Sequence, residues 1–381
     1  MKNKFLSLFA IILLTTSCSQ GTPTRRSDML LKDVYSGFFT IGAAVNEQNI
    51  PLEEDVEDDG LYNHFNSMTL ENDMKWSKLH PNENNYTFET ADKYVSFAKS
   101  HNMGIRGHAL VWYRALPGYM KSITNATELY EQEKKHIYDV VEHFGDSVYC
   151  WDVVNEVISD AEDEDLTDDN IYRQDDVWYK LTGKNFILKA FQYADEKLTA
   201  MGIRDKVKLY YNDYDNTKPA KLAKTKEMLK WLFESNCPID GIGLQCHYHM
   251  GSFVESELET AINDYYNLGK EYNHPFDVQI TEFDVDIYNE DPSAPQVDSY
   301  VDGAPKKVLD AQATIYDHAF KVFRRNSSKI SNVTFWGIRD NVTYMNDPVE
   351  FFGHAGPNFP YIFDIFGEKK PSFYVISDYE D

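Results

Sequence analysis

The chain of 381 residues carries 62 Asp and Glu against 37 Lys and Arg, which gives a formal net charge of −25. This charge argues against nucleic acid and anionic membrane surfaces as binding partners, because both would repel the protein. The hydrophobic fraction of 42% is sufficient for a full core, so an intrinsically disordered chain is also excluded.

The N-terminal segment has the pattern of an export signal. Lys2 and Lys4 precede an apolar run over residues 5–14, which is too short to span a bilayer, and small residues follow it up to Cys18. This ending resembles the cleavage box of a bacterial lipoprotein. We therefore expect residues 1–18 to be an export segment, with a lipid anchor at Cys18 at the outer membrane, the cell surface or the periplasm. The alternative is an ordinary signal peptide and a secreted protein.

Residues 19–34 are rich in Ser, Thr, Gly, Pro and Arg, which predicts a flexible tether. Residues 35–381 contain no low-complexity linker and no run long enough for a membrane helix, so we expect one domain. Cys150, Cys237 and Cys246 are too few and odd in number for a disulfide framework, which leaves the fold to be held by its core.

Short apolar or β-branched runs recur along this domain, each followed by a longer amphipathic stretch. The runs cover residues 39–45, 67–74, 104–112, 148–156, 207–214, 239–247, 276–284 and 333–338. The stretches between them have helical spacing; within residues 129–144, for example, Ile137, Val140, Val141 and Phe144 share one stripe. Eight strand–helix units predict an α/β fold, a single (β/α)8 TIM barrel.

An open doubly wound sheet is the alternative arrangement of such units. It normally carries a Gly-rich phosphate-binding turn after its first strand. Residues 42–44, Gly-Ala-Ala, do not supply that turn, which favours the barrel.

Polar and aromatic side chains end almost every predicted strand, and in a barrel of this type the active site forms at those C-terminal ends. They are Glu71, Asn72 and Lys75; His108 and Trp112; Asn155 and Glu156; Asn212 and Asp213; Gln245 and His247; Glu282 and Asp284; and Trp336. Carboxylates, amides and flat rings around one opening are the groups that sugar binding requires.

Glu156 and Glu282 end the fourth and seventh predicted strands, which lie across the barrel from one another. Two carboxylates that flank a glycosidic bond are sufficient to hydrolyse it. Each glutamate alone has a structural alternative as an ion-pair partner. Together, with Asn155 before one and His247 available to orient the other, they predict glycoside hydrolysis.

Six segments in order resemble the successive signatures of glycoside hydrolase family 10, the endo-β-1,4-xylanases. They are residues 71–76 (ENDMKW), 108–112 (HALVW), 151–156 (WDVVNE), 211–214 (YNDY), 243–247 (GLQCH) and 280–284 (ITEFD). The match runs from about Tyr35 to the C-terminus. The resemblance implies an endo-acting, retaining enzyme that cleaves β-1,4-xylosidic bonds in xylan or xylo-oligosaccharides and needs neither cofactor nor metal.

The resemblance also implies a role for each matched residue. Glu156 matches the acid/base and Glu282 the nucleophile of a double displacement, with the carboxyl groups about 5–5.5 Å apart. Asn155 matches the group that binds the sugar 2-hydroxyl, and His247, backed by Asp284, contacts the nucleophile. The rest of the implied substrate-binding set is Glu71, Asn72, Lys75, His108, Trp112, Asn212, Gln245, Trp336 and Tyr344.

Two segments have a metal-binding alternative. His247 and His249 alternate at a strand end, as zinc ligands can, but a third ligand is not evident in the sequence. The acidic stretch of residues 160–169 lacks the spacing of known calcium loops, so a solvated run of charge is expected there. We predict no metal site and no cofactor.

This sequence departs from the family at the outer sugar site. Where the family usually has His and Gln after the third-strand Trp, this chain has Tyr113 and Ala115, and it has Tyr344 in place of a second Trp. Ala115 and Tyr344 are smaller than the family's residues at these positions, which predicts a roomier subsite that accepts decorated xylose or glucose units. A β-1,4-glucanase, or a mixed xylanase and glucanase, is therefore the first alternative.

A non-catalytic glycan-binding lipoprotein is the second alternative. Such a protein is expected to have lost a carboxylate or an orienting neighbour. Both glutamates, Asn155 and His247 are intact here, which favours an enzyme.

Overall fold

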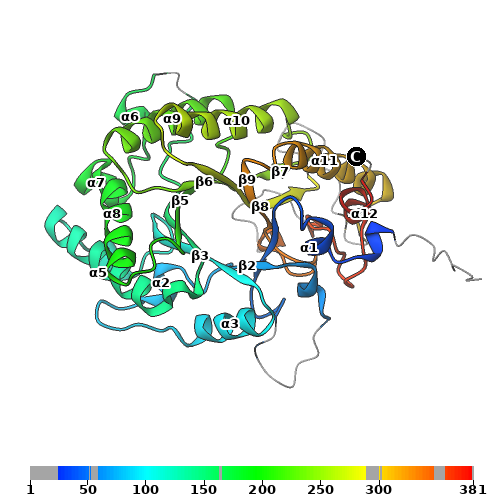
Figure 1. The fold of residues 1–381 in the computed structure, drawn as a ribbon, viewed down its shortest axis with the longest axis horizontal. Coiled ribbons are helices and arrows are strands. Elements are labelled where there is room, and N and C mark those ends of the chain that lie inside the picture. Colours follow the sequence, from blue (N-terminus) through cyan, green and yellow to red (C-terminus); the bar gives the residue numbers. More distant parts are fainter. Residues whose placement is uncertain are drawn as a thin grey trace, which may run out of the picture.

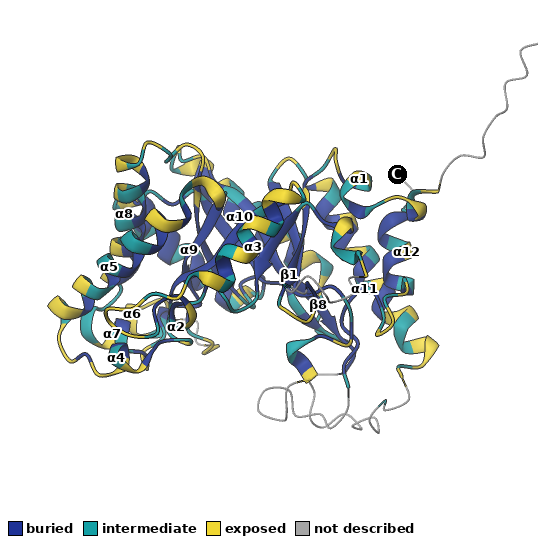
Figure 2. Ribbon diagram, turned by 90° about the horizontal axis from the view of Figure 1, so that it is seen from below, coloured by how far each residue is buried: buried dark blue, intermediate teal, exposed yellow. Residues whose placement is uncertain are grey.

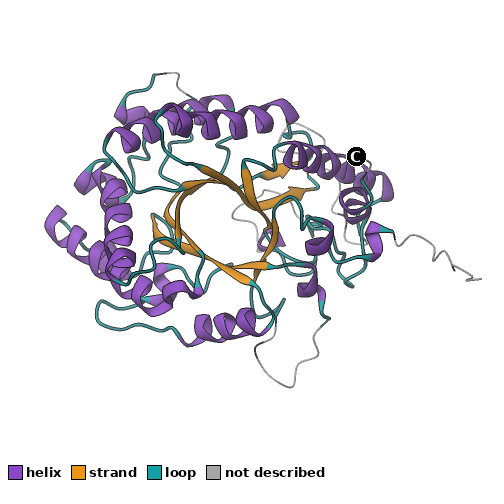
Figure 3. Ribbon diagram, viewed as in Figure 1, coloured by secondary structure: helices purple, strands orange, loops and turns teal. Residues whose placement is uncertain are grey.

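A closed ring of parallel strands forms the centre of the molecule. The computed structural model describes residues 25–50, 52, 59–162, 165–288, 300, 303–346 and 357–379. The strands in these residues are β1 (Thr40–Val45), β2 (Ser67–Leu70), β3 (Gly104–Trp112), β4 (Cys150–Asn155), β5 (Lys208–Asp213), β6 (Gly241–Leu244), β7 (His247–His249), β8 (Asp277–Asp286) and β9 (Ile330–Phe335). Eight of them follow the order β6-β5-β4-β3-β2-β1-β9-β8, and β6 pairs with β8 to close the ring (Figure 3). The predicted (β/α)8 barrel is confirmed.

Helices surround this ring (Figure 1). They are α1 (Leu31–Val34), α2 (Trp76–Leu79), α3 (Glu89–Ser100), α4 (Gly118–Lys121), α5 (Ala126–Phe144), α6 (Asp168–Ile171), α7 (Val177–Thr182), α8 (Asn185–Ala200), α9 (Pro219–Glu234), α10 (Glu255–Glu271), α11 (Lys306–Arg325) and α12 (Pro371–Ser377). Short 3-10 helices cover Arg26–Asp28, Leu61–His64, Gly145–Ser147 and Tyr344–Asn346. In the described part of the chain, no helix has the length and apolar character needed to cross a membrane.

Helix α5 illustrates why these segments fold as they do. The Asn125 side chain accepts a hydrogen bond from the Glu128 amide at 2.9 Å and caps the first turn. Gly145 ends the helix at a φ of 51°, a conformation that glycine adopts without a side-chain clash. The predicted apolar stripe, which includes Ile137 and Phe144, is buried against the barrel. Figure 2 shows the same division in the other outer helices, with buried inner faces and exposed outer faces.

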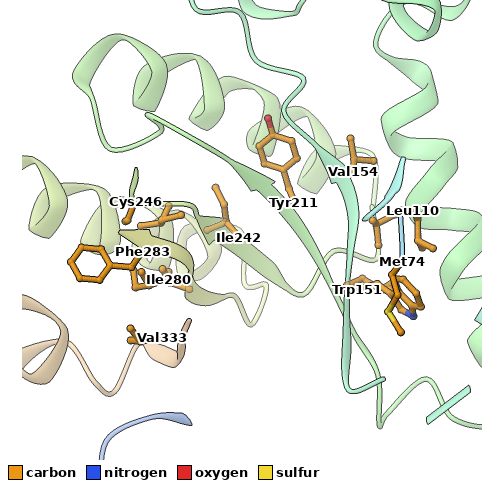
Figure 4. Close-up of a cluster of buried hydrophobic side chains, with 14 of the residues drawn as sticks. Met74, Leu110, Trp151, Val154, Tyr211, Ile242, Cys246, Ile280, Phe283 and Val333 are labelled. Atoms are coloured by element: carbon orange, nitrogen blue, oxygen red, sulfur yellow. The ribbon is translucent and has the colours of Figure 1, made fainter. Parts of the chain in front are cut away.

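The apolar core fills the space between strands and helices. Leu110, Val154, Ile242 and Phe283 lie in one buried cluster with side chains from neighbouring strands (Figure 4). Cys246 belongs to the same cluster and is 4% exposed. Successive side chains of a strand point to opposite faces of the sheet. Apolar side chains therefore pack against the helices, and the polar side chains that alternate with them point into the barrel.

The predicted sixth strand, residues 239–247, is interrupted. Strand β6 ends at Leu244, and after Gln245 and Cys246 the chain resumes as β7, which pairs with the far end of β8. Cys246 has a φ of 58°, a left-handed conformation that turns the chain. Because β8 is ten residues long, it pairs with both pieces and aligns His247 with Asp284.

The predicted tether is wrong from residue 25 onward. The Arg26 guanidinium donates to the Tyr379 carbonyl at 2.8 Å, and the Ser27 amide donates to Asp378 Oδ1 at 2.7 Å. Leu31 in α1 is fully buried. Residues 25–34 therefore pack against the C-terminal end of the domain, and residues 1–24, including Cys18 and the predicted export segment, lie outside the described residues.

Candidate active site

Glu156 directly follows β4, and Glu282 lies in β8 just beyond its last pairing with β6, at Ile280; both side chains are almost fully buried. Glu156 follows β4 with a φ of 58°, a strained conformation for a residue with a side chain. Its amide donates to the Asn212 carbonyl at 2.9 Å, and the next amide, that of Val157, donates to the Tyr211 hydroxyl at 3.1 Å. These bonds hold the turn that directs the Glu156 carboxyl group toward the strand ends.

Three amide side chains connect the two carboxylates. Asn212 Nδ2 donates to Glu282 Oε1 at 2.7 Å and to Asn155 Oδ1 at 2.9 Å. Gln245 Nε2 donates to Glu156 Oε1 at 3.1 Å and lies 3.4 Å from the same Asn155 oxygen. A reversed Asn155 amide would instead donate to the Asn212 carbonyl at 3.1 Å, but two N–H donors converge on Oδ1 in the first orientation, which we adopt. The structure thus brings these five predicted site residues together.

Glu282 is held by a charged histidine. Its Oε2 lies 3.2 Å from His247 Nε2, and His247 Nδ1 lies 2.9 Å from Asp284 Oδ2. Burial acts to lower the pKa of His247, but Asp284 and Glu282 outweigh it and raise the pKa to about 10. Burial also acts to raise the pKa of Glu282, and the hydrogen bond and charge of His247 lower it below its ordinary value. Glu282 is therefore an ionised carboxylate at neutral pH, as a nucleophile must be.

Glu156 receives its hydrogen bonds from neutral groups. Trp112 Nε1 donates to Glu156 Oε2 at 2.9 Å, and Gln245 holds the other oxygen. The two carboxylates therefore differ in their partners. Glu282 has a cationic partner, His247, which favours its charged form. Among the described residues, no cationic side chain is in direct contact with the Glu156 carboxyl group.

The side chains predicted to bind the outer sugar form a second group at the ends of β1 and β2. Lys75 Nζ donates to Asn72 Oδ1 at 2.9 Å and lies 5.0 Å from the Trp112 ring centre. Burial lowers the pKa of Lys75, and the nearby carboxylates Glu282, Glu71 and Glu156 oppose this shift. Asn46 Nδ2 donates to Glu71 Oε2 at 2.7 Å.

Asn46 is not among the strand-end residues that the sequence pattern singled out. It directly follows β1, so the strand-end criterion that found the other residues would have found it as well.

A buried charge network beneath the site was also missed. Arg106 forms a two-pronged ion pair with Asp152, at 2.6 and 2.9 Å, and its Nε donates to Gln279 Oε1 at 2.7 Å. Asp152 Oδ2 also lies 2.9 Å from His108 Nδ1. All of these side chains are buried, and the contact with Asp152 fixes the ring of His108.

Aromatic rings line the opening. The rings of Trp336 and His108 meet edge to face, with centres 5.3 Å apart, and Trp336 lies 6.2 Å from His247. The Tyr344 hydroxyl lies 3.2 Å from His247 Nδ1 and donates to Asp284 Oδ2 at 3.3 Å. Tyr344 therefore contacts the partners of Glu282, a position that the sequence did not suggest.

Two hollows flank the carboxylates. One hollow, of about 540 Å³, is lined by Asn46, Glu71, Asn72 and Tyr344, among others, and lies beside the partners of Glu282. The other hollow, of about 650 Å³, is lined by Tyr113 and Arg173, among others, and lies beside Glu156. A third hollow, between α9 and α10, contains none of the predicted site residues. The two hollows beside the glutamates continue the site on both sides, as a long polymeric substrate requires.

The segments with a metal-binding alternative are occupied by ion pairs. His249 Nδ1 lies 3.0 Å from Asp286 Oδ2, in parallel with the pair of His247 and Asp284. In the acidic stretch, Asp160 pairs with Lys221 at 2.9 Å and with Arg173 at 3.0 Å. Among the residues with described positions, no three His, Cys, Asp or Glu side chains form a group that could hold a metal ion.

Comparison with known proteins gives matches over most of the chain. The sequence model described as "Glycosyl hydrolase family 10" matches residues 30–379. The chain is 35% identical over 381 residues to a "Beta-1,4-xylanase" of Dictyoglomus thermophilum, which covers 99% of both chains. It is 35% identical over 356 residues to "Endo-1,4-beta-xylanase A" of Caldicellulosiruptor saccharolyticus, covering 92% of this chain and 95% of that one. A solved mutant structure in complex with xylotriose has 34% identity and a TM-score of 0.78, covering 92% of this chain and all of the other.

Proposed function

The chain belongs to glycosyl hydrolase family 10, and we propose that it is an endo-acting β-1,4-xylanase that cleaves xylan with retention of the anomeric configuration. One observation carries the mechanism: Glu156, directly after β4, and Glu282, in β8, are bridged by the side chains of Asn212, Asn155 and Gln245. Two carboxylates held in this way can act on the two sides of one glycosidic bond.

The first step forms a covalent intermediate. Glu282, ionised beside His247, attacks the anomeric carbon while Glu156 gives its proton to the oxygen of the leaving sugar. The bond from carbon to the leaving oxygen breaks, and an ester bond to Glu282 forms. Asn155 lies between the two carboxylates and is positioned to bind the sugar hydroxyl next to the reacting carbon, a contact that strengthens in the transition state.

The second step releases the sugar. Esterification removes the negative charge of Glu282, so Glu156, now a carboxylate, takes a proton from water. The water oxygen attacks the anomeric carbon from the side that the leaving group vacated, and the bond to Glu282 breaks. Two inversions give net retention, and each glutamate returns to its starting protonation state.

Product analysis on xylan tests this function. The wild-type protein is expected to release xylo-oligosaccharides of mixed length, and Glu282→Ala is expected to release almost none, because no other described carboxylate has the same pair of partners. A Glu282→Ala protein with wild-type products, or a wild-type protein that acts on β-glucan and not on xylan, would contradict the proposal.

The outer subsite supports a wider substrate range. Ala115 and Tyr344 replace larger family residues, and the Tyr344 hydroxyl is engaged with His247 and Asp284. We propose that the space this leaves admits decorated xylose, with glucose units as the second candidate.

We also propose that the protein is exported and anchored by a lipid on Cys18, from the charged, apolar and small residues of the first eighteen positions. Expression in a bacterium with a labelled fatty acid tests this. The label and the membrane association are expected in the wild type and not in Cys18→Ala. Label-free wild-type protein in the medium would indicate an ordinary secreted enzyme.

A further inference from the structure

The turn that carries the Glu156 carboxyl group is held from the neighbouring strand β5. The Tyr211 hydroxyl accepts a hydrogen bond from the Val157 amide at 3.1 Å and donates to Asp213 Oδ2. Glu156, one residue before Val157, has the left-handed φ of 58°. Because a residue with a side chain keeps such a conformation only where its surroundings fix it, the position of Glu156 depends on the Asp213 carboxylate.

A buried lysine in the first turn of α9 pairs with Asp213. Lys221 Nζ lies 2.9 Å from Asp213 Oδ1, and the two side chains are 6% and 0% exposed. Burial acts to lower the pKa of Lys221, but Asp213 and Asp160 outweigh it and raise the pKa, so the side chain is an ammonium group. Burial raises the pKa of Asp213 to about 6, against the opposing charge of Lys221. Without that charge, burial would favour a neutral Asp213, which is a weaker acceptor for the Tyr211 hydroxyl.

The same ammonium group reaches the other side of the turn. Lys221 Nζ lies 2.9 Å from Asp160 Oδ1. Asp160 Oδ2 accepts from the Arg173 guanidinium at 3.0 Å, and Arg173 Nε donates to the Glu156 carbonyl at 3.3 Å. The Tyr214 hydroxyl also donates to Asp160 Oδ2, at 2.7 Å, and Lys221 Nζ lies 3.5 Å from the centre of the Tyr214 ring. One buried charge is thus connected both to the Glu156 carbonyl and to the amide that follows it.

We propose that Lys221 is a positioning residue for proton transfer by Glu156. Its ammonium group holds the turn from two sides and so fixes where the carboxyl group stands relative to the leaving oxygen. This inference rests on the proposed xylanase function and adds to it a buried residue that acts through Glu156. The attack by Glu282 depends on a different contact, with His247, so the loss of Lys221 affects proton transfer and not the nucleophile.

Aryl β-xylobiosides with different leaving groups test the proposal. Departure of phenol requires the proton from Glu156, whereas 2,4-dinitrophenolate leaves without one. Lys221→Met is expected to lower kcat/KM on the phenyl substrate by roughly 10- to 100-fold, the effect of a displaced acid. On the dinitrophenyl substrate kcat/KM is expected to stay within about 3-fold. There kcat and KM fall together, because Glu156 must still take a proton from water in the second step.

Two further variants keep the test independent of folding. Tyr211→Phe leaves every charge in place and breaks the link between Asp213 and the Val157 amide. It is expected to show the same dependence on the leaving group, with a loss of roughly 3- to 10-fold on the phenyl substrate, the range of one hydrogen bond. Lys221→Arg keeps the positive charge and is expected to recover part of the activity that Lys221→Met loses. Thermal unfolding shows which variants are folded.

Lys370→Met is the control for the loss of a buried ion pair. Lys370 pairs with Asp340 at 2.8 Å, and none of the described interactions joins this pair to the Glu156 turn. The variant is expected to lower the midpoint of thermal unfolding and to keep the wild-type ratio of kcat/KM on the two aryl substrates.

Two results would overturn the proposal. Equal losses on both aryl substrates in Lys221→Met and Tyr211→Phe would mean that Lys221 only stabilises the fold. An unchanged kcat/KM on the phenyl substrate would mean that Lys221 does not hold Glu156. A wild-type protein that cuts neither aryl substrate would instead contradict the xylanase function itself.

Discussion

The Tyr344 hydroxyl lies 3.2 Å from His247 Nδ1, the nitrogen that faces Asp284. One hydroxyl thus reaches both members of the pair that holds the nucleophile, since it also donates to Asp284 Oδ2 at 3.3 Å. A series of hydrogen bonds thus runs from Tyr344, at the proposed outer sugar site, through Asp284 and His247 to the Glu282 carboxylate. Tyr344, which the sequence marks as a difference from the family, is therefore also linked to Glu282, the proposed nucleophile.

Tyr344→Phe tests this second role. Loss of the hydroxyl is expected to lower kcat on xylan by about 3- to 10-fold, the effect of one hydrogen bond in a buried network, with little change in KM. Steady-state kinetics measure the split, and Tyr374→Phe, at an exposed tyrosine of α12, is the matched control. A variant with an altered KM and an unchanged kcat would indicate that Tyr344 only contacts the sugar.

The acidic limb of the pH profile reports the ionisation of Glu282. Because the pKa of this carboxyl group is held below its ordinary value of 4.5, kcat/KM is expected to persist below that pH and to fall as the pH drops through the lowered pKa. His247→Gln keeps a donor and removes the positive charge. In that variant burial raises the pKa of Glu282 without an opposing positive charge from residue 247, so the acidic limb of the pH profile is expected to move to higher pH.

His249→Gln is the control for this shift. His249 lies in β7 with His247 and pairs with Asp286 of β8, and none of the described interactions joins it to Glu282. The acidic limb of the pH profile of His249→Gln is expected to match that of the wild type. An unchanged limb in His247→Gln would show that His247 does not set the charge of the nucleophile.

The buried pair of Arg106 and Asp152 is expected to dominate the stability of the barrel interior. Asp152→Asn leaves the Arg106 charge uncompensated, which is expected to lower the free energy of unfolding by about 3–5 kcal/mol. Denaturant unfolding measures this. Asp146→Asn, which breaks the exposed pair with Lys206, is expected to leave the free energy of unfolding almost unchanged.

The double variant Arg106→Met/Asp152→Asn removes both charges and is expected to recover part of the lost stability. Equal stability of the wild type and Asp152→Asn would contradict this assignment.

The width of the outer subsite is tested at residue 115. Ala115→Gln introduces bulk beside the site and is expected to lower kcat/KM on substituted xylan or mixed-linkage glucan by about 10-fold, with a much smaller effect on unsubstituted xylo-oligosaccharides. Competition between the two substrates in one reaction gives the ratio directly. A wild-type protein with no activity on substituted xylan or on mixed-linkage glucan would contradict the proposal of a roomier outer subsite.

Much of the fold follows from local sequence signals. Each barrel strand is a short apolar run, and each long helix has a stripe such as Ile137 to Phe144, so the repeating units could be recognised without a structure. Because parallel strands present their C-terminal ends at one face, polar residues at those ends were correctly expected to meet there.

Three features escaped the sequence for physical reasons. The break after Leu244 has no glycine or proline to mark it, because Cys246 adopts the left-handed conformation itself. Arg106 interrupts an apolar run, and its partner Asp152 is in another strand. Residues 25–34 are polar in composition, and the contacts that order them involve Asp378 and Tyr379, some 350 positions away.

Covalent trapping tests the central claim, that Glu282 attacks the sugar and Glu156 moves the proton. A xylobioside with fluorine at the 2-position and a good leaving group is expected to form a stable ester, and mass spectrometry of the digested protein should find one sugar on the peptide that contains Glu282. Glu156→Ala should still be labelled, since the leaving group needs no proton. A label on Glu156, or turnover that releases the inverted anomer without any label, would contradict the account.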